Sequence, residues 1–185
     1  MGDSEKVSPG LAAWRYDGRV TAAVSEIVRP ATPADIEAVC RRMRWADRLE
    51  LRAAGESVGA FRARLLAEPP GTVWYGERSG RPLGLFGCWI RHEGLAAMGV
   101  IWAVFTPHVD RHAVFAARVA RRFIAESRAE CQLVGNYVHV PHVAAQRWLQ
   151  ALGAEFGGPV SHGPRQEPFL PFLFGSVRPR AVNDV

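Results

Sequence analysis

The sequence contains little cysteine, almost no lysine and no long apolar run, and each shortage excludes a class of protein. Its three cysteines are an odd number without the spacing of metal ligands, which argues against both a disulfide framework and a zinc site. We expect all three to be buried, reduced thiols. No apolar run approaches the ~20 residues of a membrane-spanning helix, so no membrane partner is expected. Lys6 is the only lysine, so arginine supplies nearly all the positive charge in a chain of net charge +5.

Dense basic runs with interleaved aromatic residues, the usual mark of a nucleic-acid surface, are also absent from the sequence. A nucleic-acid partner is therefore not expected. Arg111, Arg118 and Arg122 nevertheless recur along one predicted helix, and they leave open a module that binds nucleic acid or another anion. Such a module would bind DNA with a steep dependence on salt concentration.

The chain is expected to form one domain with an extension at each end. Residues 1–23 are predicted to form an extended N-terminal arm, 24–176 a single domain, and 177–185 a C-terminal tail. The arm carries Trp14 and Val20, and disordered tails seldom contain such apolar residues. We therefore expect the two extensions to pack against another protein surface, such as that of a neighbouring subunit.

Apolar periodicity predicts an alternation of strands and helices in one α+β domain. Thr32, Pro33 and Asp35 mark a helix start, because a threonine N-cap, a proline in the first position and an acidic first turn all favour a helix N-terminus. The strand–helix–strand unit between about 98 and 138 predicts one parallel crossover in an otherwise antiparallel sheet. Helices are expected over about 33–43, 45–54, 57–68, 109–128 and 142–152, and strands over 24–29, 72–77, 83–90, 98–105, 132–138, 154–160 and 169–174, with the last two strands paired as a closing hairpin.

This order of elements resembles the GNAT (GCN5-related N-acetyltransferase) fold over about residues 24 to 175. The segment Ile27–Ile36 looks like the first strand and helix cap of that fold. The resemblance implies an α/β/α sandwich. Its mixed, mostly antiparallel sheet of about six or seven strands would contain one parallel β-α-β crossover and carry helices on both faces.

A narrower resemblance links the chain to the GNAT-like proteins of short-tailed bacteriophages. It rests on Val134–Val140, His142, Arg147-Trp148-Leu149 and Gly153–Phe156, with Arg29-Pro30 and Ala53-Ala54-Gly55 earlier in the chain. One branch of those proteins is linked to assembly of the internal core of the virion. The resemblance implies a virion-associated or assembly protein that contacts other phage structural proteins or itself, in the virion or the host cytoplasm. The alternative is an acetyl-CoA-dependent N-acetyltransferase that transfers the acyl group to an amine.

The start of the predicted central helix departs from the GNAT pattern for binding coenzyme A. Members of that family hold the pyrophosphate on backbone N–H groups, in a motif whose glycines let the backbone approach the phosphates. Here Arg111 and Ala116 fit the ends of the motif, but Val114 takes the key glycine position and Asp110 adds negative charge. We therefore expect a degenerate site without a cofactor. If acetyl-CoA binds, the nearest candidates are Ala103, Phe105, Arg111 and Asn136.

The last predicted helix lacks the tyrosine that protonates the departing thiolate in many GNAT enzymes, because Leu149 stands at that position. No catalytic residue is therefore expected. In an active enzyme, Tyr137, His139 and Asn136 would be the candidates. A simpler role for Asn136 is to tie two separating strands together, and for His139 and His142 a hydrogen-bonding role at the bend is expected rather than a metal site.

Two further groups have a structural and a functional interpretation. Asp47 and Glu50 share a helical face with Arg44, which favours a solvated row of ion pairs; the alternative is a carboxylate base for an amine substrate. The tryptophans Trp89, Trp102 and Trp148 are expected in the core.

Overall fold

One eight-stranded sheet runs through the described residues, 25–93 and 96–175, of the computed structural model. The strand order is β1-β2-β3-β4-β5-β8-β6, and β7 also pairs with β8. The predicted arm, 1–23, and the predicted tail, 177–185, lie outside the described residues. The strands are β1 (Glu26–Pro30), β2 (Val73–Arg78), β3 (Arg81–Glu93), β4 (Ala96–Phe105), β5 (Leu133–His139), β6 (Ala154–Phe156), β7 (Val160–His162) and β8 (Glu167–Phe174).

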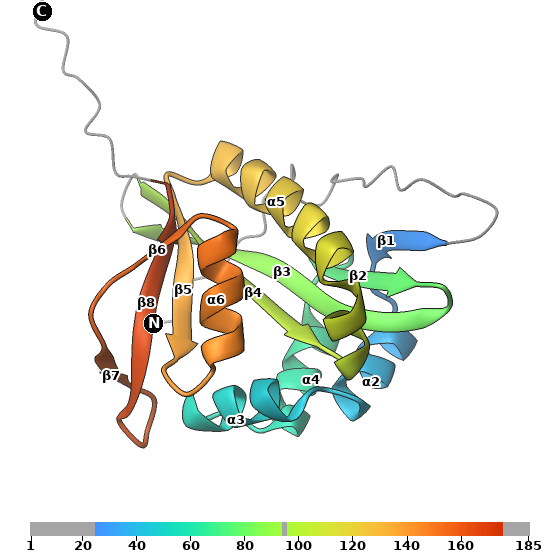
Figure 1. Ribbon diagram of the computed structural model, residues 1–185, viewed down its shortest axis with the longest axis horizontal. Helices are drawn as coiled ribbons and strands as arrows, with labels where there is room; N and C mark the ends of the chain where they lie inside the picture. The colour runs from blue at the N-terminus through green and yellow to red at the C-terminus, as the bar shows by residue number, and fades with distance from the viewer. Residues whose placement is uncertain (1–24, 94–95, 176–185) are drawn as a thin grey trace, which may run out of the picture.

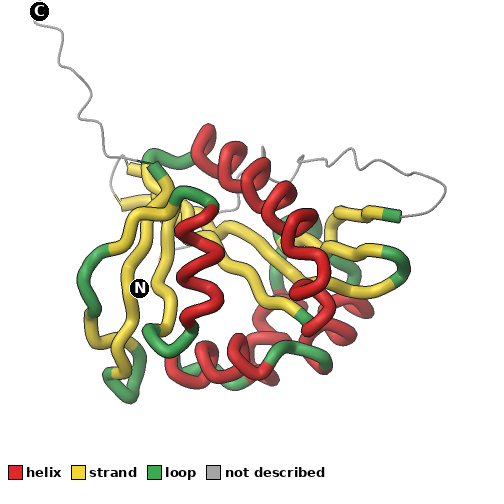
Figure 2. Tube along the Cα trace, viewed as in Figure 1, coloured by secondary structure: helices red, strands yellow, loops and turns green. Residues whose placement is uncertain are grey.

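Helices cover both faces of this sheet (Figures 1 and 2). They are α2 (Pro33–Arg41), α3 (Trp45–Ala53), α4 (Val58–Ala67), α5 (Ala113–Glu130) and α6 (Val143–Ala151). Val73 and Tyr75 of β2 pack into the core formed with α2 and α4, whereas Trp74 between them packs into the core formed with α5 and α6. Alternation along a strand thus gives the sheet two apolar faces. Within the described residues, no helix has the length and apolar character to cross a membrane.

The first helix begins where the sequence predicts. The Thr32 side chain accepts a hydrogen bond from the backbone N–H of Asp35, and the Asp35 carboxylate accepts one from the backbone N–H of Thr32. This capping box satisfies N–H groups that have no partner inside the helix. Arg29 donates to the same carboxylate at 2.6 Å, so the cap also joins α2 to β1.

The central helix starts later than predicted, at Ala113 instead of residue 109. Pro107–His112 form a 3₁₀-helix, η1, between β4 and α5. The side chain of Thr106 accepts from the N–H of His108, and its carbonyl accepts from the N–H of Val109. These bonds wind the chain into a tight turn immediately after β4.

The parallel crossover is confirmed. β4 pairs in parallel with β5 only through Met98↔Leu133, Gly99↔Val134 and Val100↔Gly135. Beyond these residues the two strands separate. The predicted closing hairpin of 154–160 with 169–174 is wrong in one respect: the segment divides into β6 and β7, and both pair with β8. This division raises the number of strands to eight.

Candidate functional site

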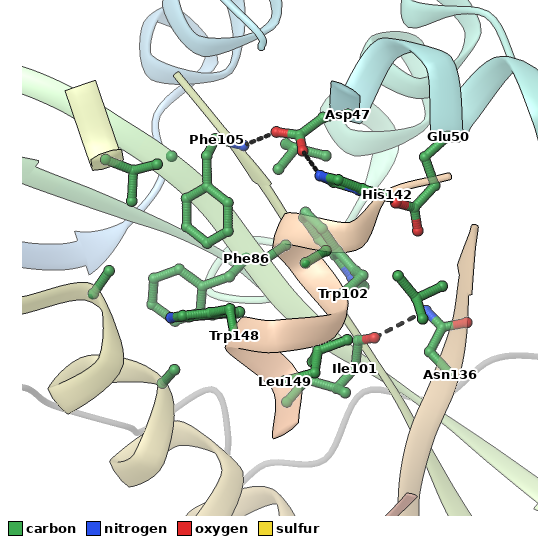
Figure 3. A pocket seen from close by; sticks show the side chains of 18 of the residues that line it. Asp47, Glu50, Phe86, Ile101, Trp102, Phe105, Asn136, His142, Trp148 and Leu149 are labelled. Atoms are coloured by element: carbon green, nitrogen blue, oxygen red, sulfur yellow. Dashed lines mark hydrogen bonds and ion pairs between the residues drawn. The ribbon is translucent and has the colours of Figure 1, made fainter. Parts of the chain in front are cut away.

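The gap between the separating ends of β4 and β5 is spanned by side chains. The Asn136 amide on β5 donates to the carbonyl oxygen of Ile101 on β4 at 2.9 Å, as Figure 3 shows. This contact confirms the strand-tying interpretation of Asn136. At the end of β4, the Phe105 N–H donates to Asp47 Oδ2 at 2.7 Å, and the Arg44 N–H donates to the Phe105 carbonyl at 2.8 Å. Groups that β5 no longer pairs are thus satisfied from elsewhere.

Ala103 lies midway along β4 between Ile101 and Phe105, the two residues whose backbone groups have these partners. The N–H and C=O of one strand residue point to the same edge, and successive residues alternate between edges. Ile101 and Phe105 direct these groups away from β3, so Ala103 does the same. Pairing with β5 has already ended at Val100. Within residues 25–93 and 96–175, the Ala103 amide therefore presents an unpaired strand edge to the gap.

A cavity of about 500 Å³ opens at this gap and runs between the sheet, α5 and α6 on one side and α3 and α4 on the other. Its walls are mainly apolar, and Phe105 packs edge-on against Trp148 with ring centroids 5.5 Å apart. Three of the four residues predicted nearest to acetyl-CoA, namely Ala103, Phe105 and Asn136, line the cavity, whereas Arg111 does not.

The acidic residues of α3 form a buried polar cluster with α6. Asp47 is 5% exposed, and its carboxylate accepts from Arg44 at 2.9 Å as well as from Phe105. Glu50 Oε2 lies 2.5 Å from Nδ1 of His142, and Nε2 of that ring lies 3.7 Å from Asp47 Oδ1. The ion pair predicted for this face is present between Arg44 and Asp47, but the prediction that it is solvated is wrong, because Arg44 is 19% and Asp47 5% exposed. α3 packs this face against the end of β4 and the start of α6, which buries it.

His142 is the least satisfied member of this cluster. Its side chain is 6% exposed. A carboxylate beside Nδ1 requires the ring proton there, so a neutral ring carries a lone pair on Nε2. Among the described residues, Nε2 has no hydrogen-bond partner, and neither does the indole Nε1 of Trp102. Trp102 packs against the core formed with α2 and α4, as Trp89 does, and Trp148 packs against the other core, so all three predictions are confirmed. His142 and Trp102 also line the cavity.

The opposite end of the site, near the start of α5, is basic. Burial lowers the pKa of His112, and the positive charges of Arg78, His108, Arg111 and Arg81 lower it further. Asp110, the acidic residue of this segment, pairs with Arg44 at 3.3 Å. Val114 is 77% exposed. The bonds to Thr106 already occupy the N–H groups of His108 and Val109, so the backbone of η1 does not form a glycine-type phosphate cradle.

The predicted catalytic candidates separate in space. Tyr137 lines the cavity and stacks on His162, with ring centroids 4.8 Å apart. His139 is buried outside the cavity lining, with Nε2 3.0 Å from Glu167 Oε2. Leu149, at the expected tyrosine position, is buried and lines the cavity. Of the two described tyrosines, only Tyr137 reaches the cavity.

The structure also shows where the cysteines lie and whether a metal ion could bind. All three cysteines are buried free thiols, as expected. Across residues 25–93 and 96–175, no group of three His, Cys, Asp or Glu side chains is placed to hold a metal ion.

The Asp47–Glu50–His142 cluster could have been partly anticipated. Asp47, Glu50, Leu51 and Ala54 follow helical spacing, and all four line the cavity. A helix with acidic and apolar residues on one face is unusual for a solvated surface. Its contact with His142, ninety-two positions away, has no local signal.

The GNAT fold predicted from the sequence is confirmed by known structures. An aminoglycoside N(6')-acetyltransferase from Legionella pneumophila superposes with a TM-score of 0.64 at 11% identity, covering 80% of this chain and 91% of that one. The NatC complex bound to Gag peptide and CoA gives 0.61 at 13%, covering 82% and 98%. YncA from Salmonella typhimurium with its cofactor acetyl-CoA gives 0.53 at 18%, covering 86% and 98%. No family model and no curated protein sequence matches the chain.

Proposed function

We propose that this chain is an acyl-CoA-dependent N-acyltransferase that uses acetyl-CoA to acylate an amine. The observation that carries the proposal is the open gap between β4 and β5, with the unpaired Ala103 edge at the mouth of a cavity of about 500 Å³. The superposed structures support it, because NatC is bound to CoA and YncA to acetyl-CoA.

The residues of the gap suit the amide-containing arm of coenzyme A. An extended ligand that carries amides can add to a free strand edge through main-chain hydrogen bonds. Ala103 offers one N–H and one C=O for such pairing. Asn136 lies across the gap with its Nδ2 committed to Ile101. The apolar walls around Phe105 and Trp148 exclude water from the thioester, which is the group that acetyl-CoA supplies for acyl transfer.

The phosphates would be held by side chains rather than by a glycine cradle. Arg78, Arg81 and Arg111 lie close enough to His112 to affect its charge state. Guanidinium groups bind phosphate through charge-assisted, two-pronged hydrogen bonds. The pairing of Asp110 with Arg44 leaves this cluster positive overall. The exposed Val114 side chain keeps the phosphates from approaching the backbone closely, but it does not keep them from the arginine side chains.

We assign protonation of the leaving thiolate to Tyr137, because its side chain lines the cavity. Leu149 cannot do so, and Tyr75, the other described tyrosine, donates its hydroxyl proton to Glu77. This assignment makes Tyr137 the functional substitute for the tyrosine missing from α6.

The assembly role, with other phage structural proteins or copies of this chain as partners in a virion or host cytoplasm, stays a prediction. A scaffold with a decayed site has no need of a large apolar cavity, because each Å² of apolar surface left in contact with water forgoes about 25 cal/mol of stabilisation. The retained cavity therefore favours the enzyme over the scaffold.

Calorimetric titration with acetyl-CoA tests the proposal. We expect acetyl-CoA to bind at one site with micromolar affinity. We also expect mass spectrometry to detect acetylated products when the protein and acetyl-CoA are incubated with a panel of amines. Ala116 and Ala117 are both half-buried neighbours on α5, but only Ala116 lines the cavity. Ala116→Leu should weaken binding about tenfold, a loss of about 1.4 kcal/mol, and Ala117→Leu should not. A wild-type chain that neither binds acetyl-CoA nor transfers acetyl groups would overturn the proposal.

A further inference from the structure

The polar cluster of Asp47, Glu50 and His142 stands at the α3 end of the cavity, away from the basic start of α5. Figure 3 shows His142 between the two carboxylates, beyond the gap that Asn136 spans. All three residues line the cavity. The buried Nε2 of His142 has no hydrogen-bond partner among the described residues. A buried polar atom without a protein partner needs a water or a ligand group as its partner, and at His142 this atom belongs to a side chain that lines the cavity.

The charge around this cluster favours a cation. Asp47 and Glu50 contribute two carboxylates, whereas Arg44 supplies one guanidinium, which it shares between Asp47 and the exposed Asp110 of η1. Glu50 has His142 as its partner, so a neutral ring leaves its charge uncompensated. The Glu50 side chain is 25% exposed, and a partly buried carboxylate without a counter-ion still loses solvation that nothing replaces. An ammonium group entering here would supply the missing charge.

The chemistry of the ring complements that charge. The Nδ1–H group of His142 donates a hydrogen bond to Glu50 Oε2, which fixes the orientation of the ring. Nε2 then carries the lone pair, which can accept a proton. Beyond the carboxylates, Leu51 of α3 and Ala54 just after it line the cavity. The Trp102 indole meets Phe61 edge-on, with ring centroids 5.6 Å apart. The cavity wall thus changes from acidic to apolar, which suits an acceptor that has a charged amine at one end and an apolar body.

We propose that this cluster is the amine-acceptor site, in which His142 Nε2 takes a proton from the substrate ammonium and Glu50 acts as its positioning residue. The transfer step rests on the proposed function. The ammonium passes one proton to Nε2, and the neutral nitrogen then forms a C–N bond to the thioester carbonyl carbon as the C–S bond breaks. The Tyr137 hydroxyl gives its proton to the departing thiolate and regains one from the acylated nitrogen, and His142 releases to solvent the proton that it accepted.

The first test needs no catalysis. Phenethylamine, an alkyl ammonium on an apolar body, is titrated into ¹⁵N-histidine-labelled protein without coenzyme. We expect the Nε2 signal of His142 to move and the Nδ1 signal to remain that of a hydrogen-bonded N–H. Glu50→Gln should weaken this binding about tenfold. Glu167→Gln is the matched control, because Glu167 is also a partly exposed carboxylate beside a histidine, His139, and neither residue lines the cavity.

The second test separates a proton acceptor from a structural residue. His142→Asn should lower kcat for phenethylamine about 100-fold, which is typical of a lost general base. It should change the rate with aniline, which is already neutral at pH 7, by less than about threefold. His139→Asn is the control, since His139 is also a buried histidine beside a carboxylate but lies outside the cavity lining.

The outcomes distinguish this inference from the proposed function. Equal losses with both amines, or no response of the His142 signals to phenethylamine, would overturn the inference even if acetyl-CoA binds well. If acetyl-CoA does not bind, the proposed function fails. The phenethylamine titration is still decisive in that case. If the His142 Nε2 signal moves, and if phenethylamine binds more weakly to Glu50→Gln and His142→Asn, the cluster binds the amine even without acetyl-CoA.

Discussion

At its start the β4–β5 pair is closed by backbone hydrogen bonds, and a few residues further along it is held open by side chains. At the closed end, Gly99 and Gly135 let neighbouring groups come close. A Cβ at Gly99 would lie 2.9 Å from Cys88 Sγ, and a Cβ at Gly135 would press on the carbonyl oxygen of Phe172. At the open end, Asn136 and Asp47 occupy the backbone groups that β5 leaves unpaired.

The comparison teaches how a sheet keeps a permanent opening. Separating two central strands exposes backbone groups, and each buried one without a partner costs about 1–3 kcal/mol. Here Ile101 and Phe105 receive side-chain partners, so the opening is stable without a ligand. Ala103 alone of the three turns its amide to the gap without such a partner among the described residues. The site is thus defined by the one backbone position that the fold leaves unsatisfied.

The largest expected effect is at the closed end. Gly135→Ala forces a methyl group against the backbone of β8, and backbone cannot rotate away as a side chain can. We expect a loss of about 3 kcal/mol in the free energy of unfolding, measured by urea denaturation. Gly158→Ala is the control, since a Cβ there meets nothing within 4 Å. Equal stability of the two variants would contradict the view that close packing holds this end shut.

The next effect is at the open end, on Asp47. Asp47→Ala removes the acceptor of the Phe105 N–H and one partner of Arg44, and leaves both groups largely buried. We expect a loss of about 2 kcal/mol, together with weaker acetyl-CoA binding as the end of β4 moves. Glu37→Ala, which breaks an exposed pair with Arg62, should cost less than about 0.5 kcal/mol. A cost for Asp47→Ala no larger than that of Glu37→Ala would show that the opening does not depend on this carboxylate.

The closed and open ends of the β4–β5 pair also differ in how far the sequence predicts them. Closed packing follows local rules: the capping box at Thr32, the apolar run of β4 and the period of α5 all predict their elements, and the parallel crossover follows from their order. The open end depends on contacts between distant segments, such as Asp47 with Phe105 and Glu50 with His142. Local patterns show that α3 has an acidic face, but only the packing of α3 on β4 and α6 shows that this face is buried.

A smaller effect is expected where Asn136 spans the gap. Asn136→Ala leaves the Ile101 carbonyl without its donor, which should cost about 1 kcal/mol. Hydrogen exchange should become faster at residues 101–105 and stay unchanged at Met98, Gly99 and Val100, which the ladder holds. Gln132→Ala, an exposed position just before β5, should change neither region. Faster exchange along the whole of β4 would mean that the two ends are not independent.

The smallest effect concerns the mouth of the open end, where His112 lies among arginines. Burial and these neighbours lower the pKa of His112 in the folded chain, so folding favours the neutral ring. Its contribution to stability is therefore present above about pH 6.5, the ordinary histidine value, and is lost as the pH falls through the lowered folded value. Because the residue is near the surface, His112→Asn should alter this pH dependence by less than about 0.5 kcal/mol.

A bound phosphate should reverse the sign of that pH dependence. Negative charge beside His112 favours the charged ring, so binding should take up a proton and tighten as the pH falls from 7 to 5.5. Acetyl-CoA titrations in two buffers of different ionisation enthalpy measure the proton directly, and His112→Asn should reduce the uptake. His92→Asn, an exposed histidine on β3, should leave it unchanged. Binding that is unaffected by pH and by His112 would place the phosphates away from the start of α5, and the opening between β4 and β5 would then lead to a different surface.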